Sequence, residues 1–226
     1  MADSANLIQA VKEGNLDAIR KQLAGDSSLV HSRDEDGVSA LMFSVYRMRP
    51  DVTQLLLDNG AEPAFHEAAA LNLTDRLSAF LAQSPALLNA PAKDGFPALT
   101  LACFFGAMDA VDLLLRSGAD PNIPAQNKMR VTALHSAVAN RDLAKAERLV
   151  RMLLAHHANP NVKQEGALTP LHHPAALGHK DLARILMEHG ADPNAAADNG
   201  KTPIYLAREN GHADLVELLS NWQASK

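Results

Sequence analysis

The chain has 226 residues, of which 21 are basic and 26 acidic, and 47% are hydrophobic. This composition is typical of a folded globular protein, not of a disordered tail. The net charge of −5, without a Lys/Arg cluster able to neutralise phosphates, argues against nucleic acid as a partner. The single Cys103 excludes an intrachain disulfide and fits a reducing compartment. No signal-peptide pattern or apolar run of ~20 residues is present, so a cytoplasmic protein without membrane contact is expected.

Two short patterns recur along the chain in a fixed order. The string Thr-Pro-Leu-His at 169–172 returns in related form at 39–42, 97–100, 132–135 and 202–205. Successive copies start 33 to 37 residues apart, except for one step of 58 that fits two short units. Between them, Leu-rich stretches end in Gly-Ala or His-Ala, three of which continue into Asp/Asn-Pro-Asn. Each unit is therefore predicted to run helix, turn, helix, turn, extended loop.

The recurring residues are those that begin and end helices. A Thr before a helix accepts a hydrogen bond from an unpaired amide, and Pro at the first helical position loses no needed donor, which predicts starts at Thr169-Pro170 and Thr202-Pro203. A glycine tolerates the left-handed conformation that follows a helix. The expected helix stops are Gly60, Gly118, Gly178, Gly190 and Gly211.

In these motifs the sequence resembles the ankyrin repeat family, and the resemblance covers nearly the whole chain. It implies an all-α solenoid, a single domain of stacked helix-turn-helix units with extended β-turn finger loops. The third unit lacks its finger, the fifth is about one helical turn longer, and Pro174 is expected to remove a backbone hydrogen bond inside a helix of the sixth. The units, with the first and last as caps, are expected at residues 1–33, 34–63, 64–91, 92–122, 123–161, 162–194 and 195–226.

Motifs for catalysis or for cofactor binding are not found. The sequence has no Gly-rich phosphate loop, Gly-x-Ser-x-Gly or His-Glu-x-x-His, so no catalytic residue and no cofactor is expected. Cys103 occupies a small-residue position of its unit and is predicted to be a core thiol. No convergent ligand set is recognised among the ten histidines, so no metal site is expected. Half of them stand where the resemblance implies a histidine bonding between turns: His66, His135, His172, His179 and His212.

The resemblance implies that partners contact the fingers and three first-helix positions on the concave face. Five of the nine aromatic residues fall on such positions in units two and four. Either they form an exposed hot spot, or they fill the gap left by the missing finger of unit three. Units five to seven carry mostly small or polar residues there, including Ser136, Asn140 and His173, so a partner is expected toward the N-terminal half. The predicted partner-binding residues are Phe43, Tyr46, Arg47, Leu71, Lys93, Phe96, Phe104 and Phe105; Glu67 and Ala70 hold equivalent positions in unit three.

The sequence thus favours a monomeric protein-interaction module without chemistry of its own, binding a partner protein through its concave face. One alternative is a regulator that binds a small molecule or metal with the aromatic and histidine surface. Another is an enzyme working through Cys103, which predicts a thiol that is alkylated rapidly in the native state.

Overall fold

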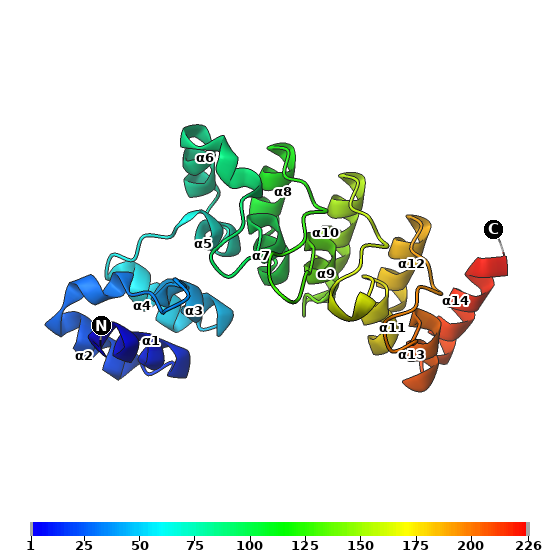
Figure 1. Cartoon of the computed structure of the whole chain (residues 1–226), viewed down its shortest axis with the longest axis horizontal. Helices are drawn as coiled ribbons and strands as arrows, with labels where there is room; N and C mark the ends of the chain where they lie inside the picture. The colour runs from blue at the N-terminus through cyan, green and yellow to red at the C-terminus, as the bar shows by residue number, and fades with distance from the viewer. Residues whose placement is uncertain (1, 225–226) are drawn as a thin grey trace.

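The computed structural model describes residues 2–224, and the side chains of residues 3–222. This part of the chain folds into fourteen α-helices and three short 3-10 helices; it has no strand, only isolated bridges between Arg33 and Ser39 and between Pro91 and Pro97. The expected all-α solenoid is confirmed, and Figure 1 shows the helices following one another in an elongated stack with the termini at opposite ends. The helices are α1 (Ala2–Glu13), α2 (Leu16–Gly25), η1 (Ser27–His31), α3 (Ala40–Tyr46), α4 (Pro50–Asp58), α5 (Phe65–Ala70), α6 (Thr74–Gln83), η2 (Pro85–Asn89), α7 (Ala98–Phe105), α8 (Met108–Arg116), α9 (Ala133–Val138), α10 (Leu143–Ala155), η3 (Glu165–Ala167), α11 (His172–Leu177), α12 (Lys180–Glu188), α13 (Pro203–Glu209) and α14 (Ala213–Ala224).

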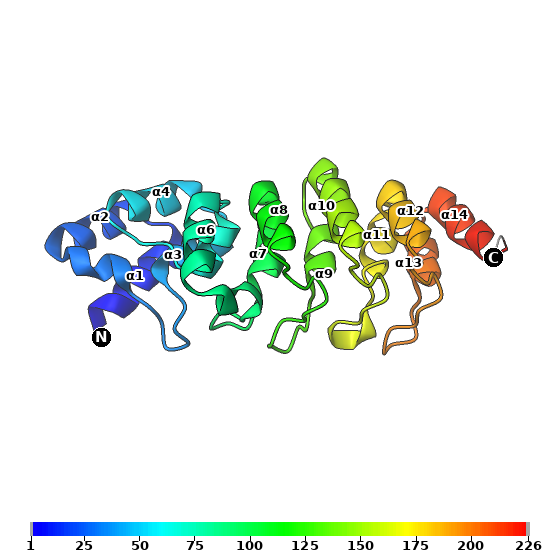
Figure 2. The same ribbon diagram turned by 90° about the horizontal axis from the view of Figure 1, so that it is seen from above.

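The stack has two layers of helices and a row of loops. Figure 2 shows α7, α9 and α11 in one layer, here called the inner layer, and α8, α10 and α12 in the outer layer. The loops between successive helix pairs, here called fingers, project beyond the inner layer. One helix pair cannot enclose a core, so each pair buries its apolar residues against its neighbours.

Side-chain caps start several helices where the sequence predicts them. The Ser39 hydroxyl accepts a hydrogen bond from the Met42 amide at 2.9 Å, and the Thr202 hydroxyl accepts one from the Tyr205 amide at 3.2 Å. Pro203 is the first residue of α13, where a proline costs no backbone hydrogen bond.

The start predicted at Thr169-Pro170 is wrong by two residues, because α11 begins at His172. Pro174 has no N–H to donate to the carbonyl of Pro170. The regular helix therefore does not include Pro170 and Leu171. Pro174 becomes the third residue of α11, where its missing donor is not needed. The expected defect inside a helix is therefore replaced by a later helix start.

The fingers are tied to one another by backbone hydrogen bonds. The amides of Gln126, Glu165 and Asp198 donate to the carbonyls of Gly95, Met129 and Gly166, at 2.7, 3.0 and 2.9 Å. Gly95 has a φ of +87°, and a Cβ there would lie 2.8 Å from the Gln126 backbone, so only glycine fits this junction. The last four fingers thus form one connected row.

At the opposite edge, asparagine side chains link successive units. The Asn161 side chain accepts from the Asp192 amide and donates to the Gly190 carbonyl, both at 2.8 Å. Asn122 makes the equivalent bonds with Asn159, at 2.7 Å, and His157, at 3.0 Å. The final asparagine of the Asp/Asn-Pro-Asn marker is therefore the residue that joins one unit to the next.

The apolar interior is interrupted between α4 and α5. Buried residues between Leu7 and Ala61 form one core, and those between Phe65 and Leu219 form another. Residues 59–64 connect α4 directly to α5 without a finger, so nothing equivalent to the finger row joins the second and third units. Helices α1–α4 accordingly form a group at one end of the molecule (Figure 1).

The outer helix of the fifth unit is longer than its two neighbours in the outer layer. The outer helix α10 has 13 residues, whereas α8 and α12 have 9, so the additional residues of this unit form one more turn. Asp142 caps this turn by accepting from the Lys145 amide at 3.2 Å, and Leu143 is exposed on it. Among the described helices, none is both long and apolar enough to cross a membrane.

Candidate functional site

The inner layer and the fingers enclose an elongated groove of about 720 Å³, here called the inner-face groove. It extends over α7, α9 and α11, and its wall is mainly apolar, although Ser136, His135, His172 and His173 also line it. The larger apolar side chains that line it are Tyr46, Phe96, Leu101, Phe104, Met129, Val131, Leu168 and Leu206.

Aromatic rings form the N-terminal end of the groove. Phe104 is 41% exposed, and its ring meets that of Phe105 edge to face at 5.1 Å. Phe105 is half-buried and lies 6.1 Å from the Tyr46 ring. Behind these rings lies a small apolar cluster of buried residues, with partly buried ones packed against it: Met42, Val45, Ala70, Leu101, Val38, Leu71 and Phe96.

This cluster lies between the two cores. The rings around it are compatible with both interpretations that the sequence left open, an exposed hot spot and the filling of the gap left by the missing finger. Tyr46, Phe96 and Phe105 are half-buried and contact residues of α3, α5 and α7, which is the place left without a finger. Tyr46 also donates a hydrogen bond from its hydroxyl to the Asp94 carboxylate. Phe104 faces solvent and lines the groove.

The remaining predicted residues are spread over the N-terminal end. Phe43 is half-buried against the N-terminal core, with the Lys12 ammonium 3.9 Å above its ring, and it does not line the groove. Leu71 is half-buried between that core and the small apolar cluster behind the aromatic rings, here called the bridging cluster. Arg47, next to Tyr46, and Lys93, on the first finger after the gap, are exposed.

Two residues assigned to the concave surface in unit three are buried instead. Glu67 is only 5% exposed, because its carboxylate accepts a hydrogen bond from the Ser39 hydroxyl and another from the Ala64 amide, the latter at 2.6 Å. Ala70 is 7% exposed within the bridging cluster. Glu67 thus joins the second unit to the third and is unavailable to a partner.

Sequence reasoning missed the part of the groove that lies over units five and six. Met129 is 50% exposed, and Val131 and Leu168 line the groove beside it. Val131 and Leu168 directly precede Thr132 and Thr169, just as Phe96 precedes Pro97. This shared position is the signal that identifies them, and it extends the candidate site beyond the N-terminal half. Of the polar residues expected there, Ser136 and His173 line the groove.

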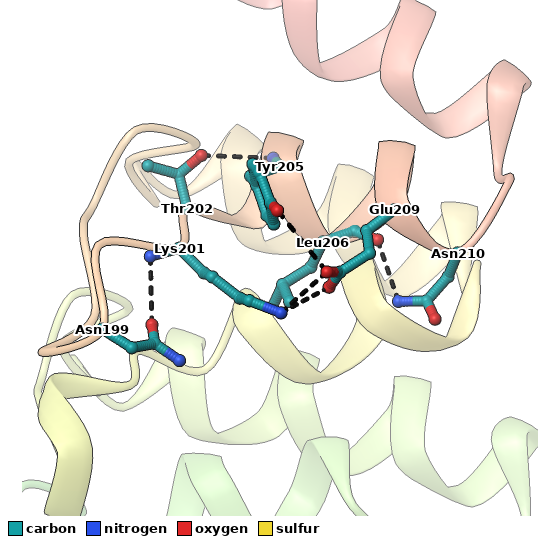
Figure 3. Close-up of polar contacts among 7 residues, drawn as sticks. All are labelled: Asn199, Lys201, Thr202, Tyr205, Leu206, Glu209 and Asn210. Atoms are coloured by element: carbon teal, nitrogen blue, oxygen red, sulfur yellow. Dashed lines mark hydrogen bonds and ion pairs between the residues drawn. The ribbon is translucent and has the colours of Figure 1, made fainter.

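The last unit, whose Leu206 lines the groove, carries a cluster of polar contacts (Figure 3). The Lys201 ammonium lies 2.8 and 2.7 Å from the two carboxylate oxygens of Glu209. The Tyr205 hydroxyl, on an exposed side chain, lies 3.5 Å from the same carboxylate. The charges of Lys201 and Glu209 therefore neutralise each other.

The histidines have mainly structural roles in this fold. His135 and His172 bond to the threonines three residues before them, Thr132 and Thr169, and across to the carbonyls of Leu168, at 3.1 Å, and Lys201, at 3.3 Å. Burial lowers the pKa of His135 to about 4 and lowers the pKa of His172. His66 and His212 also reach carbonyls, whereas the buried Nδ1 of His179 has no partner. Within residues 3–222, no three potential ligands converge on a metal position.

Cys103 is fully buried beside α9, and burial raises the pKa of its thiol. A thiol in this state is a poor nucleophile, since the thiolate is the reactive form. The geometry therefore agrees with the prediction of a core thiol.

Comparison with known proteins gives a consistent assignment. The family model described as ankyrin repeats in three copies matches residues 65–164 and 144–226. A putative ankyrin repeat protein, YahD of Escherichia coli strain K12, is 27% identical over 188 residues, covering 79% of this chain and 92% of its own. Protein PhlB of Serratia liquefaciens is 31% identical over 140 residues, covering 58% of this chain and 60% of its own.

Proposed function

Because this chain belongs to the ankyrin repeat family, whose members are generally protein-interaction modules, we propose that it binds a partner protein in the inner-face groove. The observation that supports this proposal is the exposure of large apolar side chains along one concave surface, since such patches mark interaction sites. In this proposal the protein acts as a cytoplasmic monomer of seven repeats and catalyses no reaction itself.

The proposed hot spot is the pair of exposed residues Phe104 and Met129. They come from α7 and from the finger that precedes α9, and both line the groove. Large side chains near the centre of an interface usually carry most of its binding energy. The half-buried rings of Tyr46 and Phe105 support Phe104 from behind.

The test compares three single variants in capture experiments from a lysate of the source organism. Phe104→Ser and Met129→Ser are expected to lose a protein that the unchanged chain retains. Leu143→Ser is the matched control, because Leu143 is 44% exposed but lies on the outer helix α10. All three are expected to melt within about 4 °C of the unchanged protein, since they alter exposed side chains. A partner retained equally by all variants would contradict the proposal.

A second candidate function is binding of a small apolar ligand. The volume of the groove, about 720 Å³, lies within the range of about 300–1,000 Å³ typical of small-molecule sites. A ligand that binds the native chain raises the melting temperature, and at a given concentration it does so more the tighter it binds. A compound whose stabilising effect is lost in Phe104→Ser but retained in Leu143→Ser would favour this candidate over the first.

A further inference from the structure

Most exposed charges that directly adjoin groove-lining residues in the sequence are positive, whereas the whole chain is negative. The chain carries a formal charge of −5. Four exposed cations directly adjoin groove-lining residues in the sequence, whereas Glu165 is the one carboxylate in such a position. The four cations are Arg47, Lys128, Arg130 and Lys163.

These cations are available to a partner. The ion pairs among residues 3–222 involve other basic residues, and none includes any of the four. Two carboxylates close to the two ends of the groove are already engaged, Asp94 by the Tyr46 hydroxyl and Glu209 by Lys201. The four cations therefore have no ion-pair partner among the described side chains.

Three of the four cations, Lys128, Arg130 and Lys163, lie on fingers whose backbones are tied to one another. Lys128 and Arg130 flank Met129 in a finger whose turn is closed by Asn127, with the Met129 amide 3.1 Å from the Asn127 side-chain oxygen. That finger is joined to both neighbours, because Gln126 bonds to Gly95 and Met129 accepts from Glu165. The four cations do not line the groove themselves, but each is exposed directly next to a residue that does, so a chain lying in the groove would pass close to them.

We propose that the groove binds an acidic segment of a partner protein, in which bulky apolar side chains alternate with Asp or Glu. This inference rests on the proposed function and adds the chemistry of the partner to it. The apolar side chains enter the groove beside Phe104, Met129 and Leu168, and the carboxylates pair with Lys128, Arg130 and Lys163. Charge complementarity of this kind mainly speeds association and excludes partners of the wrong sign.

The test uses three fluorescein-labelled peptides of about twelve residues, a length that can span a recognition groove. All have the same Leu and Phe positions, and the intervening positions are Glu in the first peptide, Gln in the second and Lys in the third. We expect the Glu peptide to bind the full chain about tenfold more tightly than the Gln peptide, and the Lys peptide not to bind measurably. Added salt should reduce this difference.

A charge-reversed protein provides the decisive comparison. In the double variant Lys128→Glu with Arg130→Glu, the preference should reverse in favour of the Lys peptide. The matched control is Arg148→Glu with Arg151→Glu, which changes the net charge equally at exposed positions of the outer helix α10 and should keep the original preference. Melting curves establish that both variants are folded.

Several results would overturn the inference. One is an unchanged preference for the Glu peptide in the Lys128/Arg130 variant, and another is equal binding of all three peptides. Binding to phosphatidylserine vesicles without binding of the Glu peptide would also overturn it. If no peptide binds while capture from lysate still depends on Phe104 and Met129, the acidic partner is excluded and the proposed function stands. If the peptides bind but capture is insensitive to those residues, the proposed function fails instead.

Discussion

The Tyr46 hydroxyl donates a hydrogen bond to the Asp94 carboxylate, which joins α3 directly to the finger that precedes α7. The two residues lie 48 positions apart and belong to units on either side of the one without a finger. Together with the bond between Ser39 and Glu67, this contact spans the place where the two apolar cores are separate. The junction therefore combines a small apolar cluster with specific polar bonds.

Removing the Tyr46 hydroxyl should weaken this junction. Tyr46→Phe is expected to lower the free energy of unfolding by about 1–2 kcal/mol, because Asp94 loses a partially buried partner. Tyr205→Phe is a suitable control, since the Tyr205 hydroxyl is 3.5 Å from Glu209 on an exposed side chain and its loss should have little effect. Urea titrations of the two variants measure the difference; equal stabilities would show that the Tyr46 bond contributes nothing.

The same tyrosine should make the protein sensitive to alkali. Burial, and then the neighbouring Asp94 carboxylate, raise the pKa of Tyr46 above its ordinary value of 10.0. The unfolded chain releases this proton from about pH 10 upward while the native chain keeps it, so native stability is retained below pH 10 and falls as the pH rises beyond it. Urea titrations at increasing pH should show a smaller decline for Tyr46→Phe than for the unchanged protein, and parallel declines would refute the assignment.

The asparagine links between units predict a second stability effect. Asn161→Ala removes the hydrogen bonds to Asp192 and Gly190 and should cost about 1 kcal/mol, because both bonds are largely exposed. Asn194 holds the same place in the last Asp-Pro-Asn marker, but within residues 3–222 its side chain makes no bond to a later unit, so Asn194→Ala serves as the control. Thermal melting of the pair measures the difference. A destabilisation that is the same in both variants would show that the effect is local to the turn.

The repeated units could be predicted from the sequence because the residues that define them act locally. Ser39 and Thr202 cap helices through a contact three residues away, and Gly178 ends α11 with a φ of 75° that other residues rarely adopt. The start of α11 was predicted incorrectly because Pro174 lies four residues beyond Pro170, and its missing donor outweighs the capping preference of Thr169.

The candidate site could be predicted only in part, because burial on its surface depends on how neighbouring units pack. Phe104 and Phe105 occupy adjacent positions that the sequence treats alike, yet one is exposed and the other closes the gap beside Tyr46. Glu67 falls on a nominally exposed position but is drawn inward by Ser39, 28 residues earlier. Such long-range pairings cannot be recognised from neighbouring residues in the sequence. Val131 and Leu168 could have been recognised, because each directly precedes the recurring four-residue string of its unit, as Phe96 does.

Buried histidine should make the protein sensitive to acid. The pKa of His135 is lowered to about 4 by burial, against an ordinary value of 6.5. Between these pH values the unfolded chain binds a proton that the native chain does not, so stability should fall by up to about 3 kcal/mol as the pH drops from 6.5 to 4. His135→Gln should be less stable at neutral pH but show a flatter pH dependence. The exposed His156, replaced by Gln, is the control, and unchanged slopes in both variants would contradict the prediction.

Cys103 gives a test of whether the chain has thiol chemistry of its own. Its side chain is fully buried and the pKa of its thiol is raised by that burial, so a thiol reagent should react only when the protein opens. The labelling rate with an aromatic disulfide reagent is therefore expected to be far below that of glutathione under native conditions and to rise with urea along the unfolding transition. Cys103→Ala should abolish labelling and cost about 1 kcal/mol, since it leaves only a small cavity in the core. Rapid labelling of the folded protein at a rate independent of urea would instead show an accessible thiolate, and would reopen the interpretation of the chain as an enzyme.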